Sequence, residues 1–136
     1  MILGIVGSYR KGGTIDQAVS SVLAAAQTNG AETKKIYLKD LNIGFCNNCR
    51  HCTQEPGEEP GKCRLEDDMS ELIKEIESAD AYVIGTPVNV GNANALTQRF
   101  LERLVCYSYW PWGQAAPKMR KSYSAKKAVL ITSSAM

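Results

Sequence analysis

The chain of 136 residues is short of the features that mark several classes of protein, with one histidine, two phenylalanines and a net charge of only +2. No apolar run approaches the roughly 18 residues of a membrane-spanning helix, so we expect no contact with membranes. The small net charge gives no reason to expect nucleic acid as a partner. Residues 1–6 are apolar and lack the positive start of a secretion signal, which predicts a cytoplasmic protein.

Two familiar phosphate-binding motifs are also missing. The dinucleotide fingerprint G-x-G-x-x-G does not occur. Segment 7–14 has the glycine spacing and the final threonine of a P-loop, but Gly13 stands where the P-loop lysine would contact the β- and γ-phosphates. Nucleotide hydrolysis is therefore disfavoured, and a terminal monophosphate such as that of FMN fits the segment better. A glycine-rich turn without a ligand is the alternative.

Apolar residues at strand spacing and at helix spacing alternate along the chain. Four strands are expected, at residues 1–6, 32–38, 81–85 and 128–132. Three helices are expected between them: the first capped by Thr14 and ended by Asn29-Gly30, the second opened by Asp68, the third over residues 93–106. The third should turn Leu96, Phe100, Leu101 and Leu104 toward the core. This alternation predicts an α/β protein with a parallel sheet whose ligands bind at the carboxyl ends of the strands.

Four of the five cysteines lie in a long segment without periodicity, residues 39–66, at Cys46, Cys49, Cys52 and Cys63. The first three recur at every third residue, a spacing typical of thiolates that hold a 4Fe–4S cluster. Zinc and free or redox-labile thiols are the alternatives, although zinc ribbons favour two separated pairs. We expect Cys106 to be a core residue and assign His51 no catalytic role.

Three motifs in order resemble the NADPH-dependent FMN reductase branch of the flavodoxin-like proteins. They are Gly7-Ser8-x-Arg10 with Gly12, Gly13 and Thr14; Asp67-Asp68-Met69 after a cysteine segment; and Gly85-Thr86-Pro87-Val88 followed by Gly91-Asn92. The four-cysteine segment resembles the iron–sulfur flavoprotein subgroup of that branch. The resemblance implies a doubly wound parallel sheet of strand order 2-1-3-4-5. We expect a single FMN-binding domain over residues 1–136, with the cysteine-rich insertion at 39–66, in which the fifth strand is missing and the C-terminal part is incomplete.

The resemblance also implies the cofactor-binding residues. The FMN phosphate would bind at Ser8, Arg10, Lys11, Gly12, Gly13 and Thr14. The isoalloxazine ring would be bordered by Thr86, Pro87, Val88, Asn89 and Asn92, with Ser133 and Ser134 approaching from the last strand. The cluster would be held by Cys46, Cys49, Cys52 and Cys63, although the ten residues between the last two make a longer gap than we associate with the subgroup.

We therefore predict an FMN-dependent oxidoreductase that passes electrons between FMN and a 4Fe–4S cluster. No catalytic side chain is assigned. Its electron donor or acceptor would be a small molecule, NAD(P)H among the candidates, or a ferredoxin-like protein. One alternative is an NAD(P)H-dependent reductase of FMN or quinone without a cluster. Another, of a different class, is a zinc-stabilised interaction module.

Two further patterns concern surfaces. Acidic residues gather between Glu55 and Glu71 and basic ones between Lys118 and Lys127, and both runs are expected to be solvated. Four aromatic residues fall within residues 107–112. Because Tyr and Trp are enriched at interfaces and this density is hard to bury in so small a domain, we expect a homo-oligomer.

Overall fold

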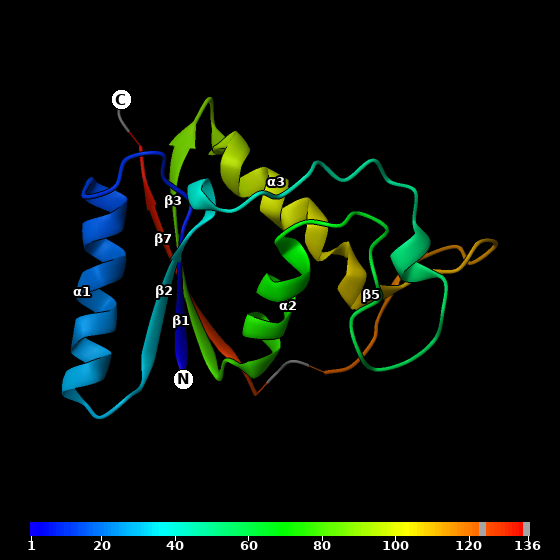
Figure 1. Cartoon of the computed structure of the whole chain (residues 1–136), viewed down its shortest axis with the longest axis horizontal. Helices are drawn as coiled ribbons and strands as arrows, with labels where there is room; N and C mark the ends of the chain where they lie inside the picture. Colours follow the sequence, from blue (N-terminus) through cyan, green and yellow to red (C-terminus); the bar gives the residue numbers. More distant parts are fainter. Residues whose placement is uncertain (123–124, 135–136) are drawn as a thin grey trace.

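A parallel β-sheet organises the chain, which the computed structural model describes over residues 1–122 and 125–134 (Figure 1). Within these residues the strands run in the order β2 (Thr33–Tyr37), β1 (Ile2–Val6), β3 (Ala81–Asn89) and β7 (Lys127–Ser133), and each neighbouring pair is parallel. The predicted order 2-1-3-4 is confirmed. Strand β7 pairs only with β3 in this part of the chain, and its Val129 and Leu130 are exposed.

The sheet is covered on both faces, as expected of strands joined by helical crossovers. Helix α1 (Thr14–Thr28) lies on one face, and α2 (Met69–Ser78) and α3 (Ala95–Arg103) lie on the other (Figure 1). Successive residues of a strand point to opposite faces, so β1 contributes to two cores. Leu3 and Ile5 pack with α2 and α3, whereas Val6 packs with α1.

The first two helices begin close to the predicted residues, but neither is capped by the predicted side chain. Gly13 is the N-cap of α1, without a capping side chain, and Thr14 is the first helical residue. At α2 the expected cap, Asp68, instead accepts a hydrogen bond from the Asn42 N–H (2.7 Å). Asp67, one residue earlier, accepts from the Met69 N–H (3.0 Å). Both predicted side-chain caps were therefore wrong, while the predicted helix starts were close.

The third helix is shorter than predicted and presents a different face. It begins after Asn94, whose side chain accepts from the Thr97 N–H (3.0 Å), because residues 92–93 form the short strand β4 (Asn92–Ala93) paired with the end of β3. It ends at Arg103 and continues as the 3-10 turn η3 (Leu104–Tyr107). Leu101, expected in the core, is 40% exposed, and Arg103 is buried in its place.

The cysteine-rich segment lies beyond the ends of α2 and α3, on the side of the molecule away from α1 (Figure 1). Residues 39–66, called the cysteine loop below, have little regular structure: the end of η1 (Leu38–Asp40) and a second 3-10 turn, η2 (His51–Thr53). The small hairpin of β5 (Ser108–Tyr109) and β6 (Lys118–Met119) follows η3. Cys106 is buried, as predicted. Among the described helices, none is both long and apolar enough to cross a membrane.

The altered face of α3 gives a test of the packing. Phe100 is 1% exposed within the core, so Phe100→Ala should lower the free energy of unfolding by about 3–5 kcal/mol through lost burial and a cavity. The matched variant Leu101→Ala should cost less than about 1 kcal/mol, since Leu101 lies outside the packed face. Urea unfolding followed by circular dichroism measures both. Equal costs would show that Leu101 is packed as tightly as Phe100 and that the helix is rotated about its axis.

Candidate functional site

Three segments meet at the carboxyl edge of the sheet. They are the loop that follows β1 (residues 7–13, called the glycine loop below), the turn at the end of β3 (residues 88–92), and the end of β7 with Ser133 and Ser134. Figure 1 shows all three at the same edge, opposite the N-terminus. The parallel register places Val6 beside Gly85 and Pro87 beside Ser133. The sheet therefore brings together the segments that the sequence assigned to one cofactor.

A buried network of polar groups fixes this edge to the start of α3. The Asn94 Nδ2–H donates to the Gly7 carbonyl (2.7 Å), and the Thr97 hydroxyl donates to that of Thr86 (2.9 Å). Gly7 also donates its N–H to the Gly85 carbonyl (2.7 Å). A Cβ on Gly7 would lie 2.1 Å from the Thr97 Oγ1, so only glycine fits here. The Thr86 side chain is thus directed to the start of α3, while its residue is paired with Thr132 of β7.

The glycine loop is closed by a buried carboxylate that sequence reasoning missed. Asp16, in the first turn of α1, accepts from the Gly12 N–H (2.7 Å), the Lys35 ammonium (2.9 Å) and the Tyr37 hydroxyl (3.0 Å). Burial alone would raise the pKa of Asp16, but these hydrogen bonds and the Lys35 charge outweigh burial and lower it. The ionised carboxylate therefore holds Gly12 in its left-handed conformation, with φ of 76°.

The remaining groups of the glycine loop are arranged for an anion. Among described residues, the backbone N–H groups of Tyr9, Lys11, Thr14 and Ile15 have no hydrogen-bond partner. Those of Thr14 and Ile15 lie at the positive end of the α1 dipole. The Arg10 side chain is exposed, and it makes no ion pair with any described group. The ammonium of Lys11 instead pairs with Asp40 (2.5 Å) over the Tyr37 ring, which directs it toward β2.

The turn after β3 is a tight hairpin. Val90 and Gly91 both have positive φ (50° and 77°) and join the paired residues Asn89 and Asn92. The Asn92 side chain accepts from Gln98 Nε2 of α3 (2.9 Å), which holds it at the base of the turn. Pro87 and Val88 are half-buried, so a rigid, partly apolar wall faces the edge next to the glycine loop.

The four clustered cysteines line one cavity of about 1180 Å³ between the cysteine loop, α2 and η3. Cys46, Cys52 and Cys63 are half-buried and Cys49 is exposed. Burial is the main cause that raises the pKa of the Cys52 thiol, and the charges of Cys63, Cys46 and Cys49 raise it further. The other three sulfurs are therefore near enough to Cys52 to interact with it electrostatically. The donor set suits a cluster in its chemistry. Within residues 1–122 and 125–134, however, no group of three or more metal-ligating side chains is close enough to hold an ion.

A buried ion pair closes one wall of this cavity. Arg103 Nη1 lies 2.6 Å from Asp67 Oδ2, and both side chains are at most 6% exposed. Arg103 also donates to the Gly44 carbonyl (2.9 Å), and Asp67 accepts from the Gly44 N–H (2.8 Å). Because Gly44 is near the start of the cysteine loop and Asp67 follows its end, the pair ties both ends of the loop to α3. Neither residue was assigned a role from the sequence.

The aromatic segment packs on the cysteine loop, which modifies the expectation of an interface. The Arg50 guanidinium lies over the rings of both Trp110 and Trp112, 3.8 and 4.2 Å from their centroids. It also donates to the Trp110 carbonyl (2.5 Å). Tyr107 is buried, while Trp112 remains exposed. The density of aromatic residues is therefore explained within the chain, by the packing of Trp110 and Trp112 on Arg50. Arg50 lies between Cys49 and Cys52 in the sequence.

Comparisons with known proteins show the family of the chain. The profile of the NADPH-dependent FMN reductase family matches residues 1–136. An iron-sulfur flavoprotein of Archaeoglobus fulgidus is 30% identical over 109 residues, 80% of this chain and 47% of that protein. An iron-sulfur flavoprotein of Methanocaldococcus jannaschii is 33% identical over 102 residues, 75% of this chain and 50% of that protein. The chain spans about half the length of the curated relatives it matches.

Solved structures support the fold. A flavone reductase superposes with a TM-score of 0.57 at 27% identity, over 75% of this chain and 28% of that one. The azoreductase AzrA superposes with a TM-score of 0.69 at 14% identity, over 98% of this chain and 68% of that one. The expected flavodoxin-like α/β fold is thus confirmed, as is the resemblance drawn from the three sequence motifs.

The buried ion pair gives a pH-dependent prediction. Burial raises the pKa of Asp67, but hydrogen bonds from Arg103, Gly44 and Met69 outweigh it and leave the pKa below the ordinary value of 3.8. A lowered pKa in the folded state stabilises the fold above the unfolded value, and this contribution is lost as the pH falls through the folded value. Asp67→Asn should cost about 3–5 kcal/mol at pH 7, because it leaves Arg103 charged and buried. The cost should shrink below about pH 4.

Urea unfolding of both proteins between pH 7 and pH 3 measures this difference. Asp68→Asn is the matched control, since Asp68 is exposed and its amide can still accept from Asn42. A cost for Asp67→Asn that stays constant down to pH 3 would contradict the assignment of an ionised Asp67.

Proposed function

This chain belongs to the NADPH-dependent FMN reductase family, and from that premise we propose that it is an FMN-dependent oxidoreductase with a 4Fe–4S cluster as its second redox centre. FMN exchanges electrons singly or in pairs and a cluster exchanges them singly, so together they convert between the two kinds of electron transfer. The protein's own part is to bind both groups at fixed places and to shield them from water.

The glycine loop is the observation that carries the proposal. Its unpartnered N–H groups, the α1 dipole and the Arg10 charge would hold a doubly charged phosphate, with the hydroxyls of Ser8 and Thr14 alongside. The amides of Gly12 and Gly13 belong to the same turn, although Gly12 donates its N–H to Asp16. Gly13 in place of a P-loop lysine leaves no side chain to reach a second and third phosphate. Lys11, paired with Asp40, would contribute only its backbone N–H.

The flat ring of the cofactor would lie along the adjacent edge. Pro87, Val88 and Asn89 would form one border with the backbone of Thr86, and Asn92 would be held in place by Gln98. Ser133 and Ser134 would approach from β7, beside Pro87. The buried network of Asn94, Thr97 and Gly7 would keep these borders rigid when the cofactor enters.

The cluster half of the proposal rests on the shared cavity of Cys46, Cys49, Cys52 and Cys63. Two matched relatives are named iron-sulfur flavoproteins. Arg103 supports anionic ligands in this cavity, since its charge acts on Cys63. The electron donor or acceptor would be a small molecule such as NAD(P)H or a ferredoxin-like protein. A homo-oligomer stays a prediction, for which the exposed Trp112 is the aromatic residue left at the surface.

Removing the charge of Arg10 tests the phosphate site. Arg10→Ala should weaken FMN binding roughly 10- to 150-fold, since a hydrogen bond to a charged group is worth about 1.5–3 kcal/mol. Binding of riboflavin, which lacks the phosphate, should be nearly unchanged. Fluorescence titration of the apoprotein with each flavin measures this, with Lys74→Ala on α2 as the control. An equal loss for both flavins would mean that Arg10 contacts the ring and that the phosphate lies elsewhere.

Anaerobic purification tests the pairing of the two centres. We expect FMN together with iron and sulfide in cluster stoichiometry, and a broad absorbance shoulder near about 400 nm in addition to the flavin bands. Cys49→Ser should remove the iron and keep the FMN, because the two sites share no side chain. Flavin bands without iron would instead indicate a reductase without a cluster. A colourless protein with stoichiometric zinc would refute the redox function.

A further inference from the structure

The gap between Cys52 and Cys63 poses a structural problem for a shared cluster. Ten residues separate these two cysteines, whereas two separate each earlier pair. The intervening residues 53–62 must leave the first three cysteines and return to them. Pro and Gly residues in the gap permit a turn but do not fix where it ends.

The side chain of Arg120 binds the first half of the gap to Cys106. Its Nη2–H donates to the Cys52 carbonyl (2.8 Å), and its Nη1–H groups donate to the carbonyls of Glu55 (2.9 Å) and Gly57 (3.1 Å). Its Nε–H donates to the Cys106 carbonyl (3.0 Å). All three guanidinium nitrogens are therefore used, and three of the four acceptors belong to Cys52 and the first half of the gap.

The end of the gap that precedes Cys63 is held by the same carbonyl group of Cys106. The Gly61 N–H donates to the Cys106 carbonyl (2.9 Å), the acceptor that also binds Arg120. A Cβ on Gly61 would lie 1.7 Å from the Cys52 carbonyl oxygen and 2.9 Å from Arg120 Nη2. Only glycine lets the two segments of the loop, at Cys52 and at Gly61, approach so closely. The loop is thus closed between Cys52 and Gly61, two residues before Cys63.

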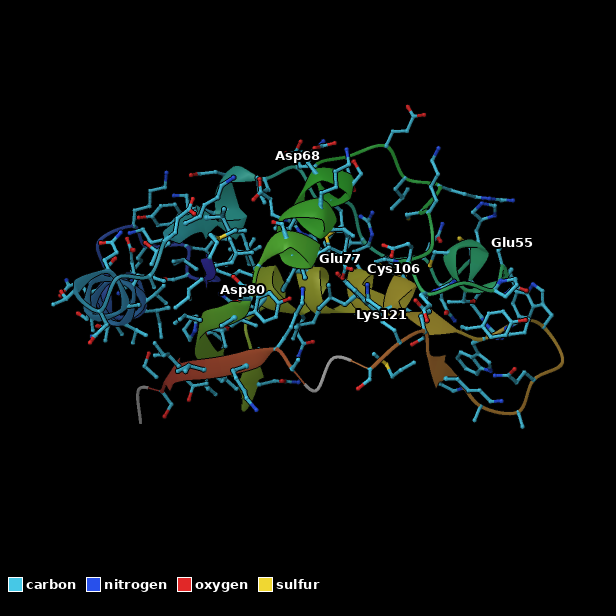
Figure 2. The ribbon with its side chains drawn as sticks, turned by 90° about the horizontal axis from the view of Figure 1, so that it is seen from below. Glu55, Asp68, Glu77, Asp80, Cys106 and Lys121 are labelled. Carbon is cyan, nitrogen blue, oxygen red and sulfur yellow. The ribbon has the colours of Figure 1, made fainter. Side chains whose placement is uncertain are left out.

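Arg120 is itself held in a fixed place. Its N–H donates to the Tyr107 carbonyl (3.1 Å), and strand β6, which ends just before it, pairs with β5. Figure 2 shows the next residue, Lys121, directed at Glu77 of α2, to which it donates a hydrogen bond of 2.6 Å. The guanidinium is therefore presented to the cysteine loop by a segment anchored on both sides.

We propose that Arg120 is the positioning residue that holds Cys63 at the cavity lined by the other three cysteines, by closing the loop between Cys52 and Gly61. This role rests on the proposed cluster and adds to it a residue outside the cysteine loop. Arg120 would act on the cysteines indirectly, through the carbonyls of Cys52, Glu55, Gly57 and Cys106. A lysine could not replace it, because one ammonium cannot donate in a plane to carbonyls on several sides.

The experiment compares Arg120→Lys with wild type after anaerobic reconstitution with iron and sulfide. Cysteine alkylation read by mass spectrometry reports each thiol separately. In the variant we expect labelling of Cys63 to rise severalfold while Cys46, Cys49 and Cys52 stay protected, with a fall in iron content and the paramagnetic resonance signal of a three-iron cluster. Lys118→Gln, an exposed cation in β6, is the control and should match wild type.

Gly61→Ala perturbs the same closure from the other side and should give the same labelling pattern, with Arg120 intact. FMN content and circular dichroism show whether each variant is folded. Unchanged protection of Cys63 in Arg120→Lys, or equal loss of protection at all four cysteines, would overturn the positioning role. If the wild type binds a complete cluster and the variant behaves like it, only the positioning role of Arg120 is refuted. If the wild type takes up no iron, both the proposed cluster and the role of Arg120 are refuted.

Discussion

Helix α3 joins the two candidate sites, and the buried pair of Asp67 and Arg103 is the contact on which that connection depends. At the start of the helix, Asn94 and Thr97 hold Gly7 and Thr86 at the carboxyl edge of the sheet. At its end, Arg103 holds Asp67 and Gly44 at the two ends of the cysteine loop. Arg103 lies six positions after Thr97, which is about 9 Å along a helix. One short rigid element therefore sets the relative position of both sites.

The energetics of the pair explain why it matters more for geometry than for stability. Burying two opposite charges has a large desolvation cost, and their attraction often only offsets it. Losing one partner is different, because the remaining charge is left buried without compensation. The pair thus adds little to the free energy of unfolding compared with an apolar contact, yet it penalises every arrangement in which the cysteine loop leaves α3. Asp16 acts similarly at the other site, where it fixes Gly12 from within α1.

Sequence reasoning predicted the elements that depend on local pattern. The starts of α1 and α2, the irregular cysteine loop and the burial of Cys106 follow from apolar spacing and turn residues, whereas the strand order came from the family resemblance. It failed at Leu101 because the buried face of α3 runs through Leu96, Phe100 and Arg103. A residue five positions after Leu96 points well away from that face. The buried arginine hid the pattern, since a charge is not expected in a core.

Arg103 and Arg120, both missed by sequence reasoning, share another property: their partners are distant in the chain. Arg103 bonds to Asp67 across 36 positions and Arg120 to Cys52 across 68, so no local spacing marks them. The basic run from Lys118 to Lys127 had the composition of a solvated surface, and its average charge said nothing of individual contacts. Asn94 did carry a signal, as a helix-capping residue before Ala95, but not one that indicated its bond to Gly7.

The ten-residue gap between Cys52 and Cys63 costs little free energy to close, so it does not prevent Cys63 from being a fourth ligand. Each doubling of a flexible loop costs only about 0.6 kcal/mol in closure entropy. A hydrogen bond from a charged group contributes about 1.5–3 kcal/mol, and Arg120 donates four of them to carbonyls around the gap. Even after the side-chain entropy that ordering an arginine costs, about 2 kcal/mol, the balance favours the closed loop. A longer gap is therefore compatible with a fourth ligand wherever such a cation reaches it, and the fixed spacing of the first three cysteines does not have to extend to Cys63.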